Sequence, residues 1–249
     1  MADYNNPVLR GQTAAAGVID EGLRAYMLRV YNYMLVALVL TGLTAYAFFA
    51  ASVVDVPGHG LQLTQFGYTL FATPLRWVVM LAPLAVVFFI SFRMQSMSVG
   101  TAQAAFWIFA GLMGISMSTI FMVYAAQSIA QVFFITAAAF GGLSLWGYTT
   151  KRDLTGFGSF LIMGLWGLII ASLVNLFLNS AMTMWVISVA GVGIFAGLTA
   201  YDTQKIKEMY YVGDDGTVAA KKSIMGALAL YLDFINMFLF LLRLLGNRR

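Results

Sequence analysis

The sequence predicts an all-α polytopic membrane protein with seven transmembrane helices, and two observations lead to this prediction. Hydrophobic residues make up 61% of the 249 residues and charged residues only 10%, whereas charged residues account for roughly 25% of ordinary soluble domains. The apolar residues fall in runs of about 20, the length that a helix needs to cross a hydrocarbon core of ~30 Å. These runs occupy nearly the whole chain, so no separate soluble domain is expected.

Several classes of function are excluded by the same composition. The chain contains no cysteine, which excludes disulfides, thiol chemistry and thiolate metal sites. Its net charge is only +4, and no basic cluster is interleaved with aromatic residues, so nucleic acid is not an expected partner. We expect no enzymatic activity and no cofactor, and the lipid bilayer is the expected environment of the chain.

The apolar segments divide the chain into a short tail and one transmembrane domain. Residues 1–23 are polar and rich in small residues and lack the apolar core of a signal peptide, so we expect a flexible cytoplasmic tail there and a single domain over residues 24–249. Two longer links separate the segments: 52–74, which contains the lone His59, and 205–222, which contains the turn sequence VGDDG. We place the seven segments at Val30–Ala51, Leu75–Phe92, Ala102–Tyr124, Ala130–Thr149, Phe157–Leu178, Met182–Gln204 and Ser223–Leu242.

The distribution of basic residues predicts the orientation in the membrane. Ten Lys and Arg residues fall in the tail and in the links on its side, against four on the opposite side, and the richer side faces the cytoplasm. We therefore expect a multi-pass protein of the cell (inner) membrane with a cytoplasmic N-terminus. Arg248 and Arg249 lie outside if all seven segments span. A re-entrant last segment would avoid this, but 223–242 is long enough to span, which favours a true seventh helix.

Two carboxylates fall inside the predicted spans, where ionisable groups are costly and mark pathways, sensors or paired charges. Asp233 lies eleven residues beyond Lys222, roughly 16 Å along a helix and thus near the midplane. Asp202 lies near the inner end of the sixth segment. If that helix continues to Gly213, the two carboxylates are level, and the sequence permits their contact.

The last segment carries its polar residues on one face. Gly226, Ala229, Asp233, Asn236 and Phe240 follow one another at spacings of three and four, which places them in one stripe along a helix. The remaining faces are Leu, Ile, Phe and Met. This pattern is typical of a helix that others enclose, with its polar stripe directed at a partner.

The chemistry of such a pair is sensitive to protons. Two carboxylates in contact in a low dielectric share a proton and titrate as a coupled pair. Arg93, at the inner end of the second segment, would favour the ionised form of a carboxylate that it touched. When deprotonated, Asp202 and Asp233 would offer the hard oxygen ligands that Ca²⁺ prefers. The alternative interpretation is that these three charges only tie helices together.

Three stretches of the chain resemble the Bax inhibitor family, the transmembrane Bax-inhibitor-motif proteins, and bacterial members in particular. They are AGLTAYDTQKIK, ALYLDFINMFLFLLRLLG and GLMGISMSTIFMVY, at 196–207, 229–246 and 111–124. The resemblance implies seven helices with the last one wrapped by the other six. It also implies a pH-sensitive Ca²⁺ leak channel whose sensor aspartates are Asp202 and Asp233 and whose latch is Arg93, with Tyr201 and Asn236 as supporting residues. Some family members carry a carboxylate in helix two, and 75–92 has none.

Two other functions remain open from the sequence. The first is a non-conducting regulator that binds a membrane protease or another membrane protein, a role associated with some bacterial family members. The second is an intramembrane aspartyl protease, since Tyr201 and Asp202 match its Tyr-Asp motif. Its second motif, Gly-x-Gly-Asp, is replaced here by LYLD at 230–233, which removes the two flexible glycines and makes the protease the less favoured interpretation.

Overall fold

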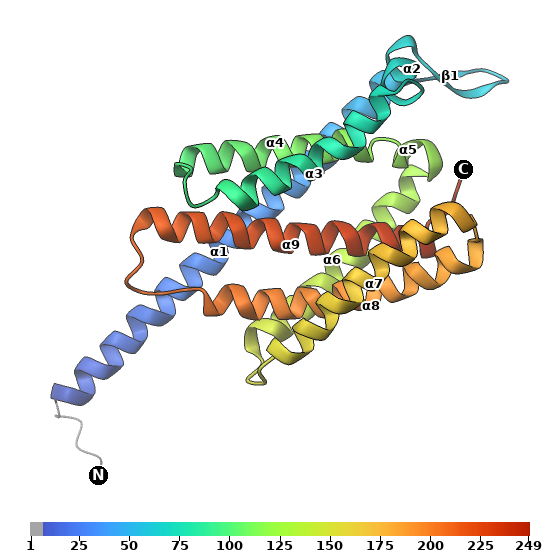
Figure 1. Ribbon diagram of the computed structural model, residues 1–249. Helices are drawn as coiled ribbons and strands as arrows, with labels where there is room; N and C mark the ends of the chain where they lie inside the picture. The colour runs from blue at the N-terminus through green and yellow to red at the C-terminus, as the bar shows by residue number, and fades with distance from the viewer. Residues whose placement is uncertain (1–6) are drawn as a thin grey trace.

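A computed structural model describes the backbone of residues 7–249 and the side chains from residue 21 onward. Within this part of the chain, seven helical segments are each long and apolar enough to cross a membrane, which confirms the predicted fold class (Figure 1). The long helices are α1 (Pro7–Ser52), α3 (Leu75–Arg93), α4 (Val99–Met117), which continues into the short α5 (Ile120–Val123), α6 (Ala126–Thr149), α7 (Thr155–Leu178), α8 (Ala181–Glu208) and α9 (Gly216–Leu245).

The first helix is longer than the sequence predicts. In place of the expected flexible tail, residues 7–23 form the first turns of α1, and residues 1–6 lie outside the described part. Proline at the first helical position suits a helix start, because its fixed φ is pre-organised and its missing N–H is not needed there. The stretch that follows Pro7 has several alanines and no further proline, so nothing in it breaks the helix.

Helix α9 lies at the centre of the bundle, as predicted, although four of the other six helices form its main contacts and not all six. It packs directly against α1, α4, α6 and α8, while α3 packs outside α4 and α7 packs outside α8. In Figure 1, α9 runs between the α3/α4 pair and the α7/α8 pair. In its most apolar window 61% of the residues are buried, against at most 28% in any other span. Because α9 carries Asp233 and Asn236 within its span, covering it with other helices keeps these polar groups away from lipid.

The two long links have more structure than the sequence indicates. In the first, β1 (Val53–Val56) pairs antiparallel with β2 (Gly60–Leu63), and α2 (Gln65–Phe71) follows. Gly58 and Gly60 have φ values of 82° and 69°, which glycine adopts without strain. In the second link, α8 ends at Glu208 and does not reach Gly213. Asp215 caps α9 by accepting a hydrogen bond from the Val218 N–H at 2.7 Å.

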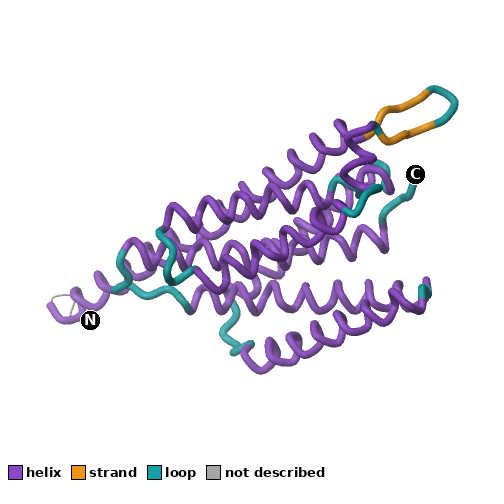
Figure 2. The backbone as a smooth tube through the Cα atoms, turned by 45° about the horizontal axis from the view of Figure 1, so that its top comes forward, coloured by secondary structure: helices purple, strands orange, loops and turns teal. Residues whose placement is uncertain are grey.

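The C-terminus lies at the end of the bundle opposite the start of α1 (Figure 2). Arg248 forms an antiparallel bridge with Tyr124, in the link between α5 and α6. The Arg249 N–H donates to the Val123 carbonyl at 3.0 Å, and the Asn247 N–H donates to Ser128 Oγ at 2.8 Å. Helix α9 therefore runs the full length of the bundle without a break, which favours a true seventh span over a re-entrant segment.

Candidate functional site

The packing register of α8 against α9 decides the depth of the two aspartates. The helices are antiparallel, and Gly226 of α9 lies against Ile206 of α8. Moving four residues back along α8 to Asp202 corresponds to moving four residues forward along α9. Asp233 then lies three residues beyond the level of Asp202, or about 5 Å deeper at 1.5 Å per residue. The two residues are therefore offset by most of one helical turn.

The two carboxyl groups meet in spite of this offset. Side chains on a helix tilt towards its N-terminus. The N-termini of α8 and α9 are at opposite ends of the bundle, so Asp202 leans deeper and Asp233 leans back. The two side chains lie close enough to influence each other, and both line the same cavity. This contact does not require α8 to extend to Gly213, the condition that the sequence interpretation relied on.

The surroundings of the two carboxyl groups disfavour a state in which both are charged. Asp233 is 4% exposed, and its Oδ2 atom has no hydrogen-bond partner among the described residues. Asp202 is half-buried. Two charged carboxylates in contact repel, so a hydrogen bond between them needs a shared proton. No third His, Asp or Glu joins the pair within the part of the chain that the structure describes.

A cavity of about 720 Å³ runs along the pair, between α7, α8 and α9. Its α7 side is formed almost entirely by leucine and isoleucine side chains. Four residues of the predicted stripe line it from α9: Ala229, Asp233, Asn236 and Phe240. The stripe therefore faces α8 and the cavity, and the cavity separates α9 from α7.

One cation stands at each end of this cavity, and the sequence interpretation assigned a role to neither. Lys205 is the positive charge that acts on Asp202, and its Nζ lies 5.8 Å from the centre of the Tyr201 ring. At the opposite end, Arg243 donates a hydrogen bond to Met184 Sδ at 3.4 Å. Both had a signal in the sequence. Lys205 follows Asp202 by three residues, and one further step of three along the α9 stripe reaches Arg243.

The structure does not bring Arg93 to the pair. Arg93 is exposed at the end of α3, and α3 packs mainly against α4. Among the described side chains, neither aspartate forms an ion pair. The counter-charge of Asp202 in this arrangement is Lys205, and the latch role of Arg93 stays a prediction.

The two supporting residues lie beside the pair in different ways. The Tyr201 ring packs against Gly158 of α7, where a larger residue would collide with it. Asn236 lines the cavity, and its Nδ2 donates to the Leu232 carbonyl of its own helix at 2.8 Å. His59 lies exposed in the turn between β1 and β2, far along the chain from either aspartate.

Comparison with known proteins gives consistent matches over nearly the whole chain. The profile of the family described as "Inhibitor of apoptosis-promoting Bax1" matches residues 23–249. The Escherichia coli K12 inner membrane protein YbhL is 47% identical over 92% of this chain and 94% of its own length. A Rickettsia prowazekii protein, RP147, and a Caulobacter vibrioides protein are each 46% identical over 100% of both chains. With the seven apolar helices, these matches establish a multi-pass membrane protein.

Proposed function

Because this chain belongs to the Bax inhibitor family of membrane proteins, we propose that it is a proton-sensitive Ca²⁺ leak channel controlled by Asp202 and Asp233. One observation carries the proposal: two carboxyl groups lie close together within the spans and line the same cavity. Ionisable groups at membrane depth are costly and mark ion pathways and proton relays by default. A purely structural tie would instead join residues of opposite charge.

The proton shared by the pair is the proposed switch. With the proton in place, Asp233 donates a hydrogen bond to Asp202, and the bond holds α8 against α9. Lys205 stabilises the negative charge on Asp202 in this state. Loss of the proton leaves two carboxylates in contact in a low dielectric, and their repulsion separates the helices at this level.

The same carboxylates suit a transient cation site. Ca²⁺ takes six to eight oxygen ligands, and among the described residues no third acidic or histidine side chain joins the pair. Two carboxylates supplemented by water hold the ion weakly. Conduction requires this, because an ion must enter a site and also leave it. Lys205 and Arg243 at the two ends of the cavity would limit the rate, since a cation must pass each positive charge.

The test is Ca²⁺ flux in liposomes that contain the purified protein and an internal Ca²⁺ indicator. The wild type is expected to leak in a pH-dependent manner, and Asp202→Asn and Asp233→Asn are each expected to remove this dependence. Asp153→Asn is the matched control, because Asp153 is an exposed aspartate in the link between α6 and α7. Arg93→Gln tests the latch role directly, by its effect on the same pH response.

Three results would overturn the channel proposal. Absence of flux at every pH would favour the non-conducting regulator, which co-purification with a membrane protease would then test. A pH response that survives in both Asn variants would exclude the aspartate pair as the sensor. Cleavage of a transmembrane peptide, lost in both Asn variants, would indicate the aspartyl protease.

A further inference from the structure

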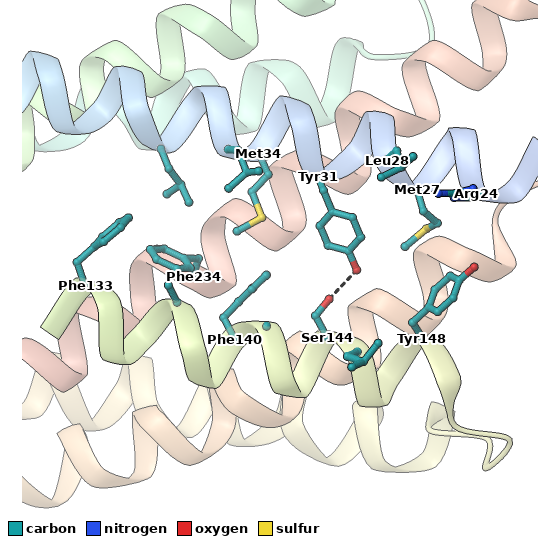
Figure 3. Close-up of a pocket in the computed structure, with 15 residues that line it drawn as sticks. Arg24, Met27, Leu28, Tyr31, Met34, Phe133, Phe140, Ser144, Tyr148 and Phe234 are labelled. Atoms are coloured by element: carbon teal, nitrogen blue, oxygen red, sulfur yellow. Dashed lines mark hydrogen bonds between the residues drawn. The ribbon is translucent and has the colours of Figure 1, made fainter. Parts of the chain in front are cut away.

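A second cavity, of about 740 Å³, lies between α1 and α6 on another side of the bundle (Figure 3). Both helices pack against α9, but they leave this space between them. One wall comes from α1 and the other from α6, and Phe234 of α9 contributes from between them. The cavity is separate from the one that contains the aspartate pair, and the proposed leak makes no use of it.

The lining of this cavity is suited to a hydrocarbon chain. It consists mainly of Leu, Met, Phe and Ala side chains, and no Asp or Glu among the described side chains lines it. The two hydroxyl groups in its middle satisfy each other, because Tyr31 Oη and Ser144 Oγ form a hydrogen bond of 2.6 Å across the space (Figure 3). Ser144 also contacts Thr203 Oγ1 of α8 at 2.9 Å. An apolar occupant therefore meets no unpaired polar group there.

The cavity is open towards the surrounding membrane. Leu28 and Leu35 on its α1 rim are 51% and 56% exposed, and Leu145 on its α6 rim is 64% exposed. Exposed leucines on a transmembrane helix face lipid. A lipid chain can therefore enter sideways between α1 and α6.

The length of the cavity matches one leaflet. It extends along α1 from Arg24 to Leu38, which is about 21 Å for fourteen steps of 1.5 Å. Half of the hydrocarbon core is about 15 Å thick, and the headgroup region adds to this. The cavity thus reaches from headgroup level to near the midplane.

Basic residues lie at the end of the cavity nearest the start of α1. Arg24 lines the cavity at the end nearest the start of α1, on the side that the charge distribution predicts to be cytoplasmic. Tyr148 lines the same end from α6, and Lys207 Nζ lies 5.0 Å from the centre of its ring and donates to its carbonyl oxygen at 2.8 Å. Basic residues beside a pocket between transmembrane helices are a recurring means of binding an anionic headgroup.

We propose that this cavity binds one acyl chain of an anionic phospholipid from the leaflet at that end of the bundle, with its phosphate between Arg24 and Lys207. The apolar lining holds the chain and the two cations select the headgroup. The site does not depend on the aspartate pair, so Asp202→Asn and Asp233→Asn are expected to bind the lipid as the wild type does.

Two adjacent glycines of α6 allow a direct test of the acyl-chain site. A Cβ added at either Gly141 or Gly142 meets no atom within 4 Å, so α6 tolerates a larger residue at both positions. Only Gly141 lines the cavity. In native mass spectrometry with phosphatidylglycerol, we expect one retained lipid for the wild type and for Gly142→Leu. Retention by Gly141→Leu is expected to be about tenfold weaker, from the loss of about two methylene contacts.

A second pair of variants tests the headgroup. Arg24→Gln is expected to lower the preference for phosphatidylglycerol over phosphatidylcholine about fivefold, the effect of one basic residue near a membrane surface. Arg29→Gln is the control, because Arg29 lies on α1 outside this cavity. Equal retention by Gly141→Leu and Gly142→Leu would overturn the chain site. Equal binding of the two lipids by the wild type, or retention of detergent alone, would overturn the anionic lipid as its occupant.

Discussion

Gly147 of α6 offers a test of the close contact that positions Asp202. A Cβ at this residue would overlap the backbone of Ala200 in α8, including its carbonyl oxygen. Ala200 is two residues before Asp202 and is 1% exposed, so this side of α8 is closely packed. Gly147→Ala therefore forces α6 and α8 apart next to the aspartate pair.

The magnitude follows from two opposing effects. Overpacking of this kind costs about 3 kcal/mol, because the obstructing atoms are backbone and cannot rotate away. Replacing glycine by alanine inside a helix returns about 1 kcal/mol, which leaves a net loss of about 2 kcal/mol. For a chain of this size we expect the Tm to fall by about 4–8 °C. The control Gly142→Ala gains the same helix propensity but causes no overlap, since its Cβ meets nothing within 4 Å. Its Tm is therefore expected to rise by about 2–4 °C.

The assay is thermal unfolding of the purified protein in one detergent, followed by the loss of monomer on size exclusion after heating. The two variants differ by five positions on one helix, so detergent effects are shared. Equal changes in Tm for Gly147→Ala and Gly142→Ala would refute the close contact between α6 and α8 next to Asp202.

Two further predictions concern charged residues. If Lys205 is the counter-charge of Asp202, Lys205→Gln will move the midpoint of the leak to higher pH, because the deprotonated pair is no longer stabilised by the lysine's positive charge. An unchanged midpoint in liposome flux would contradict this. Asp153 accepts hydrogen bonds from Thr155, which hold the pKa of its carboxyl below the usual range. The small stabilisation from these hydrogen bonds is fully present above about pH 5, because the pKa of an aspartate in the unfolded chain is ~3.9. It is lost as the pH falls through the lower pKa of Asp153 in the folded protein. Asp153→Asn removes this dependence of stability on pH, which Tm measured against pH would show. NMR titration of the wild type would show the lowered pKa of Asp153.

The run lengths of apolar residues are sufficient to predict the seven spans, because the bilayer thickness sets helix length directly. The spacing on the last helix is sufficient to predict the face that meets α8, because residues three and four apart share a face in any α-helix. Both predictions depend on local geometry alone. The polar residues of α9, which are costly to expose to lipid, likewise predict that other helices cover it.

The contact between Asp202 and Asp233 depends on information that no single segment contains. The register of α8 on α9 is set by the fit of Gly226 against Ile206, and the opposite lean of the two side chains then closes the offset. Arg93 could not be placed either, because its distance from the pair depends on which helices α3 packs against.

The bridge between the C-terminal residues and the α5–α6 link has a mechanical consequence. Three hydrogen-bonded connections fix the last residues of the chain to the 123–128 stretch, whereas the other end of α9 follows the seven-residue loop 209–215. Helix α9 is therefore anchored at its C-terminus, and a tilt of the helix would turn about that end. A push between the two carboxylates would act roughly halfway along it, and the largest displacement would fall at Gly216, next to the loop whose Asp214 pairs with Lys222.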